Sequence, residues 1–234
     1  MKSQDPEVPV PSSWPGVRPV RLLHPARSQS QADIWLVDWD GRRCVLRDFS
    51  GPRVWYFRLL CLWGVRREIE AHRQLDGIEG IPRLLHVLGW KAYLIEYIEG
   101  EPIHPRLHRP GPEFFSAVEG IVGQMHARGV AHGDLRNRNI LIGADGNPYL
   151  IDFTTAWWAT SWWRKPLFRF LQSLDRRRLA VTKARFLPEA LGHEEIELLG
   201  RKPWYLRLGW FYRQRIYPRL VKREPLRKRG KPLT

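Results

Sequence analysis

The sequence has little cysteine: Cys44 and Cys61 are the only two. Two cysteines cannot build a disulfide framework, and neither lies in a CxxC pair or in a Cys/His cluster with the spacing of metal ligands. Long apolar runs are absent too, because arginines interrupt every stretch that approaches the roughly 18 residues of a membrane-spanning helix. We therefore expect a protein of the reducing cytoplasm that does not cross a bilayer.

The first residues lack the apolar core of a secretory signal. The segment MKSQDPEVPVPSSWPG has acidic side chains and four prolines in its place. A secretory signal would need a continuous apolar stretch after its basic residues. We expect residues 1–19 to form a mobile leader ahead of the folded chain.

Acidic side chains are scarce in the last third of the chain. The formal net charge is +15, yet residues 1–159 hold 19 basic and 18 acidic side chains, whereas residues 160–234 hold 20 basic and 6 acidic ones. An excess of charge that is confined to one segment predicts a surface that meets something anionic. Phospholipid, lipopolysaccharide and nucleic acid all qualify.

The pattern of residues 20–49 is strand-like and contains the turn signal Asp40-Gly41, which predicts a hairpin of twisted sheet. Residues 54–75 contain no proline and carry apolar positions at helical spacing in their second half, which predicts a helix. A short apolar run that indicates a buried strand follows. Together these elements make residues 20–97 a sheet-rich lobe.

A linker rich in glycine and proline, EGEPIHPRLHRPGP, separates this lobe from the rest of the chain. Pro112 then opens a helix whose apolar residues recur at helical spacing until Gly129 stops it. Two short strands around the turn ADGN follow. We predict an α+β fold of two lobes, with a mainly helical second lobe at residues 98–200 and a basic, aromatic extension at residues 201–234.

The chemically informative motif is HGDLRNRN, followed after a predicted hairpin by IDF. Phosphoryl transfer requires a carboxylate near the attacking hydroxyl and two oxygen ligands that hold magnesium against the β- and γ-phosphates. Asp134 and Asn139 on the loop, with Asp152 returned by the hairpin, supply these three groups. Arg136 adds a permanent cation beside the transferring phosphate, where it would stabilise charge as the bond breaks.

These motifs resemble those of the protein-kinase-like superfamily over roughly residues 20–155, and among its members the small bacterial RIO-like kinases and the kinases of lipopolysaccharide core sugars. The resemblance implies a two-lobed fold that binds ATP and Mg²⁺ between the lobes. It implies Asp134 as the catalytic base and Asn139 and Asp152 as the metal ligands. The resemblance also implies which residues surround the nucleotide: Val45, Arg47, Glu68, Glu96, Ile98 and Leu141. Glu68 would be the helix residue that pairs with the phosphate-binding residue of the strand. Glu96 to Ile98 would form the hinge, and Leu141 would lie under the adenine ring.

The sequence departs from the family pattern in three features. Arg47 stands where the family has lysine, and its planar fork is bulkier than a point ammonium. The glycine-rich loop is missing: RSQSQAD occupies the expected turn, where Ser28, Ser30 and backbone amides would be the phosphate donors. Thr154 replaces the glycine after Asp-Phe, and no APE-like segment follows, so we expect no regulated activation loop. Arg47 could equally be a surface residue of the strand, and the two serines ordinary loop residues.

Tryptophans and basic residues gather after the IDF motif. Trp157, Trp158, Trp162 and Trp163 precede a basic stretch, and residues 204–223 interleave aromatic side chains with arginine and lysine. This mixture suits the headgroup boundary of an anionic membrane, where each basic group contributes about 1 kcal/mol. The same tryptophans could instead form the core of a reduced second lobe.

The sequence thus predicts magnesium-dependent transfer of the γ-phosphoryl group of ATP to a hydroxyl. The acceptor would be a lipid-linked sugar, such as lipopolysaccharide core, or a protein serine or threonine. We expect the protein to be cytoplasmic and to attach peripherally to the inner face of a membrane. A pseudokinase that binds nucleotide or membrane without turnover is one alternative, which Arg47 favours and the complete set of Asp134, Asn139 and Asp152 opposes. A kinase associated with nucleic acid is another, although no RNA-binding motif is visible.

Overall fold

The computed structural model describes residues 14–26, 31–50, 55–159 and 164–200, and of residues 55–62 it describes the backbone alone. The chain divides into two compact units, residues 1–191 and residues 192–234. The first unit contains every described element but one. The second unit contributes the helix α4 (His193–Gly200).

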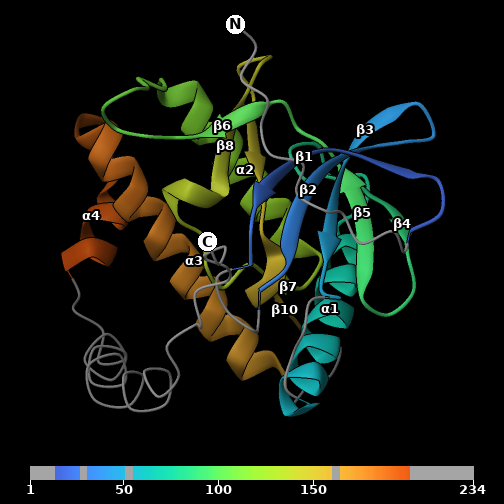
Figure 1. Cartoon of the computed structure of the whole chain (residues 1–234). Helices are drawn as coiled ribbons and strands as arrows, with labels where there is room; N and C mark the ends of the chain where they lie inside the picture. The colour runs from blue at the N-terminus through green and yellow to red at the C-terminus, as the bar shows by residue number, and fades with distance from the viewer. Residues whose placement is uncertain (1–13, 27–30, 51–54, 160–163, 201–234) are drawn as a thin grey trace, which may run out of the picture. The chain divides into compact units, whose positions relative to one another are not determined.

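The first part of the large unit is a five-stranded antiparallel sheet (Figure 1). Along the sheet the strands are β1 (Val17–His24), β2 (Asp33–Trp39), β3 (Arg42–Asp48), β5 (Ala92–Glu96) and β4 (Leu84–Val87). The predicted hairpin joins β2 to β3 through Asp40 and Gly41, which have φ angles of 50° and 73°. Two consecutive positive φ angles match the twist of the flanking strands, and Asp-Gly accepts them at little cost.

The helix α1 (Trp55–Gln74) covers one face of this sheet. Alternate residues of a strand point to opposite faces, so the sheet has two apolar layers. On the helix side, Val65 and Ile69 pack with Tyr93 and Ile95. The opposite face carries a second cluster, formed by Trp35, Val37, Cys44, Leu46, Ala92 and Leu94. Arg47 pairs with Tyr93 across the strands β3 and β5, and therefore lies on the helix side.

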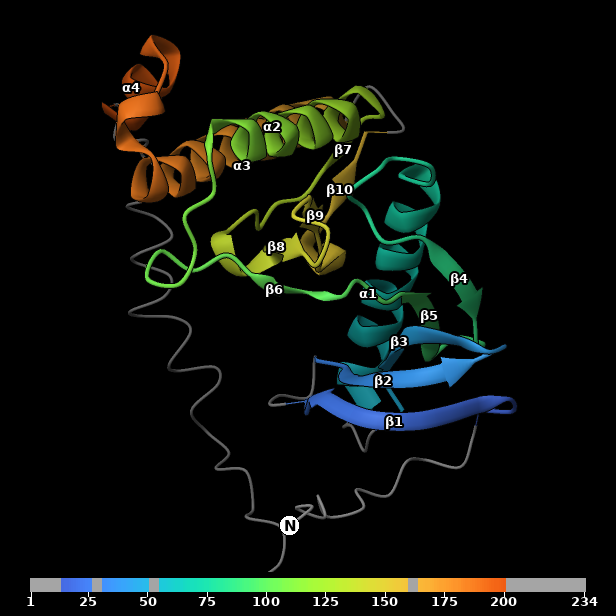
Figure 2. The ribbon, with the colours of Figure 1, turned by 90° about the horizontal axis from the view of Figure 1, so that it is seen from above.

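The second part of the large unit is built on two helices, α2 (Pro112–Ala127) and α3 (Lys165–Phe186), which lie side by side (Figure 2). Two small sheets accompany them. One has the order β6 (Gly100–Pro102), β8 (Ile140–Gly143), β9 (Pro148–Leu150), and the other pairs β10 (Trp157–Trp158) with β7 (Val130–Ala131). The described residues also form the short 3-10 turns η1 (Asn137–Asn139), η2 (Phe153–Thr155) and η4 (Pro188–Ala190).

The core of this second part gathers Phe115, Val118 and Met125 of α2 with residues of the strands and Leu179 of α3. Fully burying one side chain of this size stabilises the fold by about 1.5–3 kcal/mol. The stripe predicted for the helix that begins at Pro112 is therefore core, and the expected two-lobed α+β fold is confirmed.

The tryptophans after the IDF motif divide into two groups. Trp157 and Trp158 form β10 and are half-buried, and Trp158 packs against the core. For Trp158 the structure supports the core interpretation of the sequence. Trp162, Trp163 and the extension at residues 201–234 lie outside the described residues. Among the helices that are described, none has the length and apolar character needed to span a membrane.

Candidate active site

The loop that carries the HGDLRNRN motif connects β7 to β8, and a buried carboxylate on α3 holds its beginning. The Asp175 carboxylate is fully buried and accepts the backbone N–H groups of His132 (2.7 Å) and Gly133 (2.9 Å). The ring of His126, on α2, lies 3.2 Å from the same carboxylate. Bonds between a charged group and backbone amides are stronger than neutral ones. Asp175 therefore fixes the loop to both helices of the second lobe.

The loop is also tied to the segment that contains Asp152. Gly133 has a φ of 76°, and a Cβ at this position would lie 2.8 Å from the carbonyl oxygen of Thr155. The Thr155 hydroxyl donates to the His132 carbonyl at 2.9 Å, and the His132 ring lies 3.0 Å from the Ile151 carbonyl. Only glycine allows this close approach without strain. His132 therefore braces the backbone of this loop.

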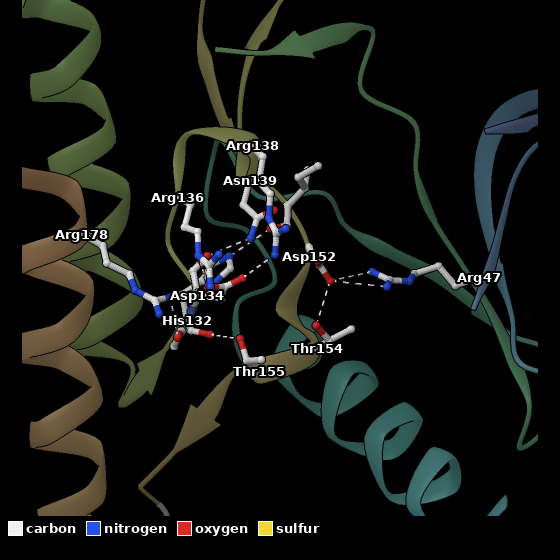
Figure 3. A network of polar contacts seen from close by, with 12 residues as sticks. Arg47, His132, Asp134, Arg136, Arg138, Asn139, Asp152, Thr154, Thr155 and Arg178 are labelled. Atoms are coloured by element: carbon white, nitrogen blue, oxygen red, sulfur yellow. Dashed lines mark hydrogen bonds and ion pairs between the residues drawn. The ribbon is translucent and has the colours of Figure 1, made fainter. Parts of the chain in front are cut away.

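Asp134 contacts three arginines (Figure 3). Arg136 reaches Oδ1 at 2.6 Å, Arg138 reaches Oδ2 at 2.9 Å, and Arg178 of α3 also contacts Oδ1. The side chain of Asp134 is 14% exposed, and those of Arg178, Arg136 and Arg138 are 27%, 48% and 62% exposed. Arg178 makes a second hydrogen bond, to the Gly133 carbonyl at 2.9 Å. The predicted base thus lies at the centre of a cationic cluster.

Asn139 is 4% exposed and bonded to the predicted base. Its side-chain nitrogen donates to the Asp134 carbonyl at 2.8 Å. Its backbone carbonyl accepts the N–H of Ile151 at 3.0 Å, which connects this loop to the strand end before Asp152. With the amide nitrogen engaged, the side-chain oxygen of Asn139 is the atom that is oriented for a cation.

Asp152 has a left-handed backbone, with φ 68° and ψ 70°. This conformation costs a non-glycine residue roughly 1–2 kcal/mol, and such strain is typical of functional sites. Oδ1 accepts the Thr154 hydroxyl at 2.9 Å and lies 3.4 Å from a guanidinium nitrogen of Arg47. Burial raises the pKa of the Asp152 carboxyl, but the charge of Arg47 and the bond from Thr154 outweigh burial and hold this pKa below its usual value. The group is therefore ionised and able to bind a cation.

Arg47 is a buried residue rather than a surface one. It is 8% exposed, and it contacts the fully buried Glu68 of α1 at 2.5 Å as well as Asp152. Burial lowers the pKa of the Arg47 guanidinium, but attraction to Glu68, Tyr93 and Asp152 outweighs burial and raises it above the ordinary value. Burial raises the pKa of the Glu68 carboxyl, and Arg47 opposes that rise. The strand residue and the helix glutamate that were expected to pair do so, with arginine in the place of lysine.

The residues expected around adenine lie on three elements. Val45 is half-buried on β3 and packs against the cluster under α1, and Leu141 lies on β8 with 7% exposure. Glu96 ends β5, and its N–H already donates to the Arg83 carbonyl at 2.9 Å, so this amide is not available to a base. Ile98 follows, between β5 and β6. Ser28 and Ser30 lie outside the described residues.

The donor set suits a hard cation. No group of three or more His, Cys, Asp and Glu side chains that could hold a metal ion occurs in the described part of the chain. Asn139 and Asp152 offer an amide and a carboxylate oxygen, and Mg²⁺ at phosphate-transferring sites takes its other ligands from phosphates and water. The residues therefore fit a magnesium ion that enters together with a nucleotide.

The contacts of Asp175, Arg178 and Arg138 in the site were not predicted from the sequence. Asp175 is the single acidic residue of α3, a helix that otherwise carries many arginines. A lone acid in a basic helix is a sequence signal that points to such a residue.

One family model matches the chain, that of the lipopolysaccharide kinase (Kdo/WaaP) family, over residues 108–187. This segment contains α2, the HGDLRNRN loop, Asp152 and α3. Curated relatives match as well. The chain is 38% identical over 64 residues to a probable bifunctional tRNA threonylcarbamoyladenosine biosynthesis protein of Methanosarcina barkeri, covering 27% of this chain and 11% of the relative.

The protein of the same description from Methanosarcina acetivorans is 33% identical over 95 residues, covering 38% of this chain and 17% of the relative. A probable SapB synthase of Streptomyces coelicolor is 29% identical over 143 residues, covering 51% and 15%. The chain thus spans less than a fifth of the length of these curated relatives. The matches confirm the resemblance to the protein-kinase-like superfamily and support a kinase.

Proposed function

We propose that this protein transfers the γ-phosphoryl group of ATP to a hydroxyl group, with magnesium as the metal. One observation carries the proposal: Asp134, Asn139 and Asp152 belong to two segments that hydrogen bonds join directly, so that the three oxygen-bearing side chains gather at one site. The kinase family match covers all three positions.

Each of these residues would have its own role in the transfer. Asp134 would orient the acceptor hydroxyl and take its proton, which requires a carboxylate within hydrogen-bond reach of the hydroxyl oxygen. Asn139 and Asp152 would hold the magnesium ion, which supplies charge neutralisation at the phosphates. Arg47 is a permanent cation beside Asp152, and Arg136 is one beside Asp134. They would stabilise the charge that spreads over the phosphoryl oxygens during transfer.

For the acceptor we propose a sugar hydroxyl on a lipid-linked glycan, with lipopolysaccharide core as the example. The name of the matching family supports this choice, and so does the basic character of the last third of the sequence, where residues 160–234 hold 20 basic and 6 acidic side chains. A cytoplasmic protein that attaches to the inner face of a membrane would meet such an acceptor. Protein serine or threonine is the second candidate.

The base and the metal ligand can be separated by substitution. Asp134→Asn should lower phosphoryl transfer by about 10²–10⁴-fold while nucleotide binding persists, and Asp152→Asn should weaken the magnesium-dependent part of nucleotide binding. Binding is measured by calorimetry with a non-hydrolysable ATP analogue, with and without magnesium, and transfer with labelled ATP against lipid-sugar, protein and RNA acceptors. Glu119→Gln, an exposed substitution on α2, is the matched control. Transfer by Asp134→Asn at the parent rate would show that Asp134 is not the base.

A pseudokinase is the alternative that one specific observation favours, namely arginine at the phosphate-binding strand position. Arg47 is held by two carboxylates, and its fork fills more space than an ammonium group. A thermal shift with ATP and magnesium, without turnover on any acceptor, would establish this alternative. The RNA acceptors test the other alternative, a kinase associated with nucleic acid, which the tRNA-related names of two relatives suggest.

A further inference from the structure

The charges around Asp134 do not balance. Three guanidinium groups contact one carboxylate. Within the described part of the chain, no other carboxylate forms an ion pair with Arg136, Arg138 or Arg178. The local excess is therefore two positive charges, at the position where an acceptor must approach the proposed base.

These contacts also restrict where an acceptor can approach the base. A general base needs an oxygen atom within hydrogen-bond reach of the hydroxyl that it deprotonates. Oδ1 of Asp134 already contacts Arg136 and Arg178, and Oδ2 contacts Arg138. Because each carboxylate oxygen accepts about two hydrogen bonds, Oδ1 is fully engaged, and an acceptor hydroxyl must approach at Oδ2, next to Arg138.

The three arginines differ in how firmly they are held. Arg138 is 62% exposed and its pair with Asp134 joins residues four apart on one loop, a kind of surface pair that contributes at most about 1 kcal/mol. Arg178 is 27% exposed and is fixed by its second bond to the Gly133 carbonyl. Oδ2 is therefore the oxygen that is released most easily, and Arg178 is the cation that is already oriented.

We propose that Arg178 and Arg138 form a subsite for a phosphate group on the acceptor, so that the substrate is a hydroxyl compound that already bears a phosphomonoester. This inference rests on the proposed function, and it leaves Arg136 to the transferring phosphate. A phosphomonoester carries a charge of about −1.5 to −2 at neutral pH, which matches the two guanidinium groups of the subsite, whereas a carboxylate would neutralise only one of them. Its three oxygens also accept the forked hydrogen bonds that guanidinium groups donate.

The subsite is tested by binding rather than by turnover. The protein is first saturated with magnesium and a non-hydrolysable ATP analogue, which occupies the γ-phosphate position. Inorganic phosphate, glucose 6-phosphate, glucose and glucuronate are then titrated, with calorimetry as the readout. We expect the two phosphate compounds to bind, glucose not to bind, and glucuronate to bind more weakly than glucose 6-phosphate.

Arg178→Gln and Arg138→Gln should each weaken binding of the phosphate compounds roughly tenfold or more, because each removes charged hydrogen bonds. Arg176→Gln, an exposed position on the same helix, should leave binding unchanged. Arg138 lies at the surface, so its variant answers the question even if Arg178→Gln fails to fold.

Equal phosphate binding by the parent and both variants would overturn the subsite. So would a loss in the variants that affects only the ATP analogue, since it would assign both arginines to the γ-phosphate. Phosphate binding through Arg178 by a protein that transfers no phosphoryl group would instead contradict the proposed function and leave the subsite intact.

Discussion

The two halves of the site hold opposite ratios of charge. In the first lobe one guanidinium, that of Arg47, lies between the carboxylates of Glu68 and Asp152, and it is almost completely buried. In the second lobe one carboxylate, that of Asp134, contacts three guanidiniums, two of which are about half exposed or more. The same chemical groups thus form a fixed pair in one place and an exchangeable cluster in the other.

Burial explains this difference. Removing one partner of a buried pair leaves a charge without water or counterion, which is expensive. Removing one partner of an exposed pair returns the other to water at little cost. The Arg47 pair is therefore suited to holding α1 against the sheet, whereas the arginines at Asp134 are suited to releasing it when another anion arrives.

The largest effect on stability is expected when the buried ion pair of Arg47 loses one partner. Glu68→Ala should lower the free energy of unfolding by about 3–5 kcal/mol, because Arg47 loses its closest counterion while it stays buried. Urea denaturation followed by circular dichroism measures the change. Glu70→Ala on the same helix, where the side chain is 40% exposed, is the matched control and should change stability by less than about 1 kcal/mol. Equal effects of the two variants would contradict a buried, structural pair.

A change of pH should have an intermediate effect on the free energy of unfolding, through His72, which lies beside the buried pair. Burial, together with the charge of Arg47, lowers the pKa of His72 to about 4, although its bond to the Pro82 carbonyl opposes this. The unfolded chain, with an ordinary His pKa of about 6.5, takes up the proton first on acidification. Stability from neutral His72 is therefore complete above pH 6.5 and lost as the pH falls toward 4.

This loss should amount to about 3 kcal/mol across that window. Unfolding free energies measured at several pH values in the parent and in His72→Gln give the comparison. The variant should lack this part of the acid sensitivity, because glutamine does not titrate. A parallel pH dependence of the two proteins would mean that His72 is accessible to protons in the folded state.

The smallest effect on stability is expected when an exposed arginine is removed from the cluster around Asp134. Arg138→Gln should change the free energy of unfolding by no more than about 1 kcal/mol, and added salt should reduce the difference further, because exposed charges are screened. Denaturation at low and high ionic strength measures both. A loss of several kcal/mol that salt does not affect would show that Arg138 is a fixed structural partner of Asp134, and the contrast between the two halves would disappear.

The sequence predicted those parts of the molecule that depend on local patterns. The turn at Asp40-Gly41, the helix that begins at Pro112 and the strands around the HGDLRNRN loop follow from turn chemistry, proline at a helix start and apolar spacing. The pairing of Arg47 with Glu68 followed from a family resemblance, since 21 residues separate the two in the chain.

The missed parts depend on contacts between distant segments. Asp175 and Arg178 meet the loop across 42 or more residues of sequence. Although α3 has many apolar side chains, only Asp175, Leu179, Ala180 and Thr182 are buried on it. No local periodicity reveals such a helix as the support of a catalytic loop. The roles of the nucleotide-binding residues stay predictions, and Ser28 and Ser30 lie outside the described residues.

Arginine on β3 also changes how this protein would respond to chemical labelling. A guanidinium stays protonated in proteins and offers no nucleophilic amine at neutral pH. Reagents that mark ATP sites by acylating a lysine amine would find no target at Arg47, which lies in contact with Glu68 and Asp152. A survey of kinases that relies on such reagents would pass over proteins with this substitution, even if they bind nucleotide well.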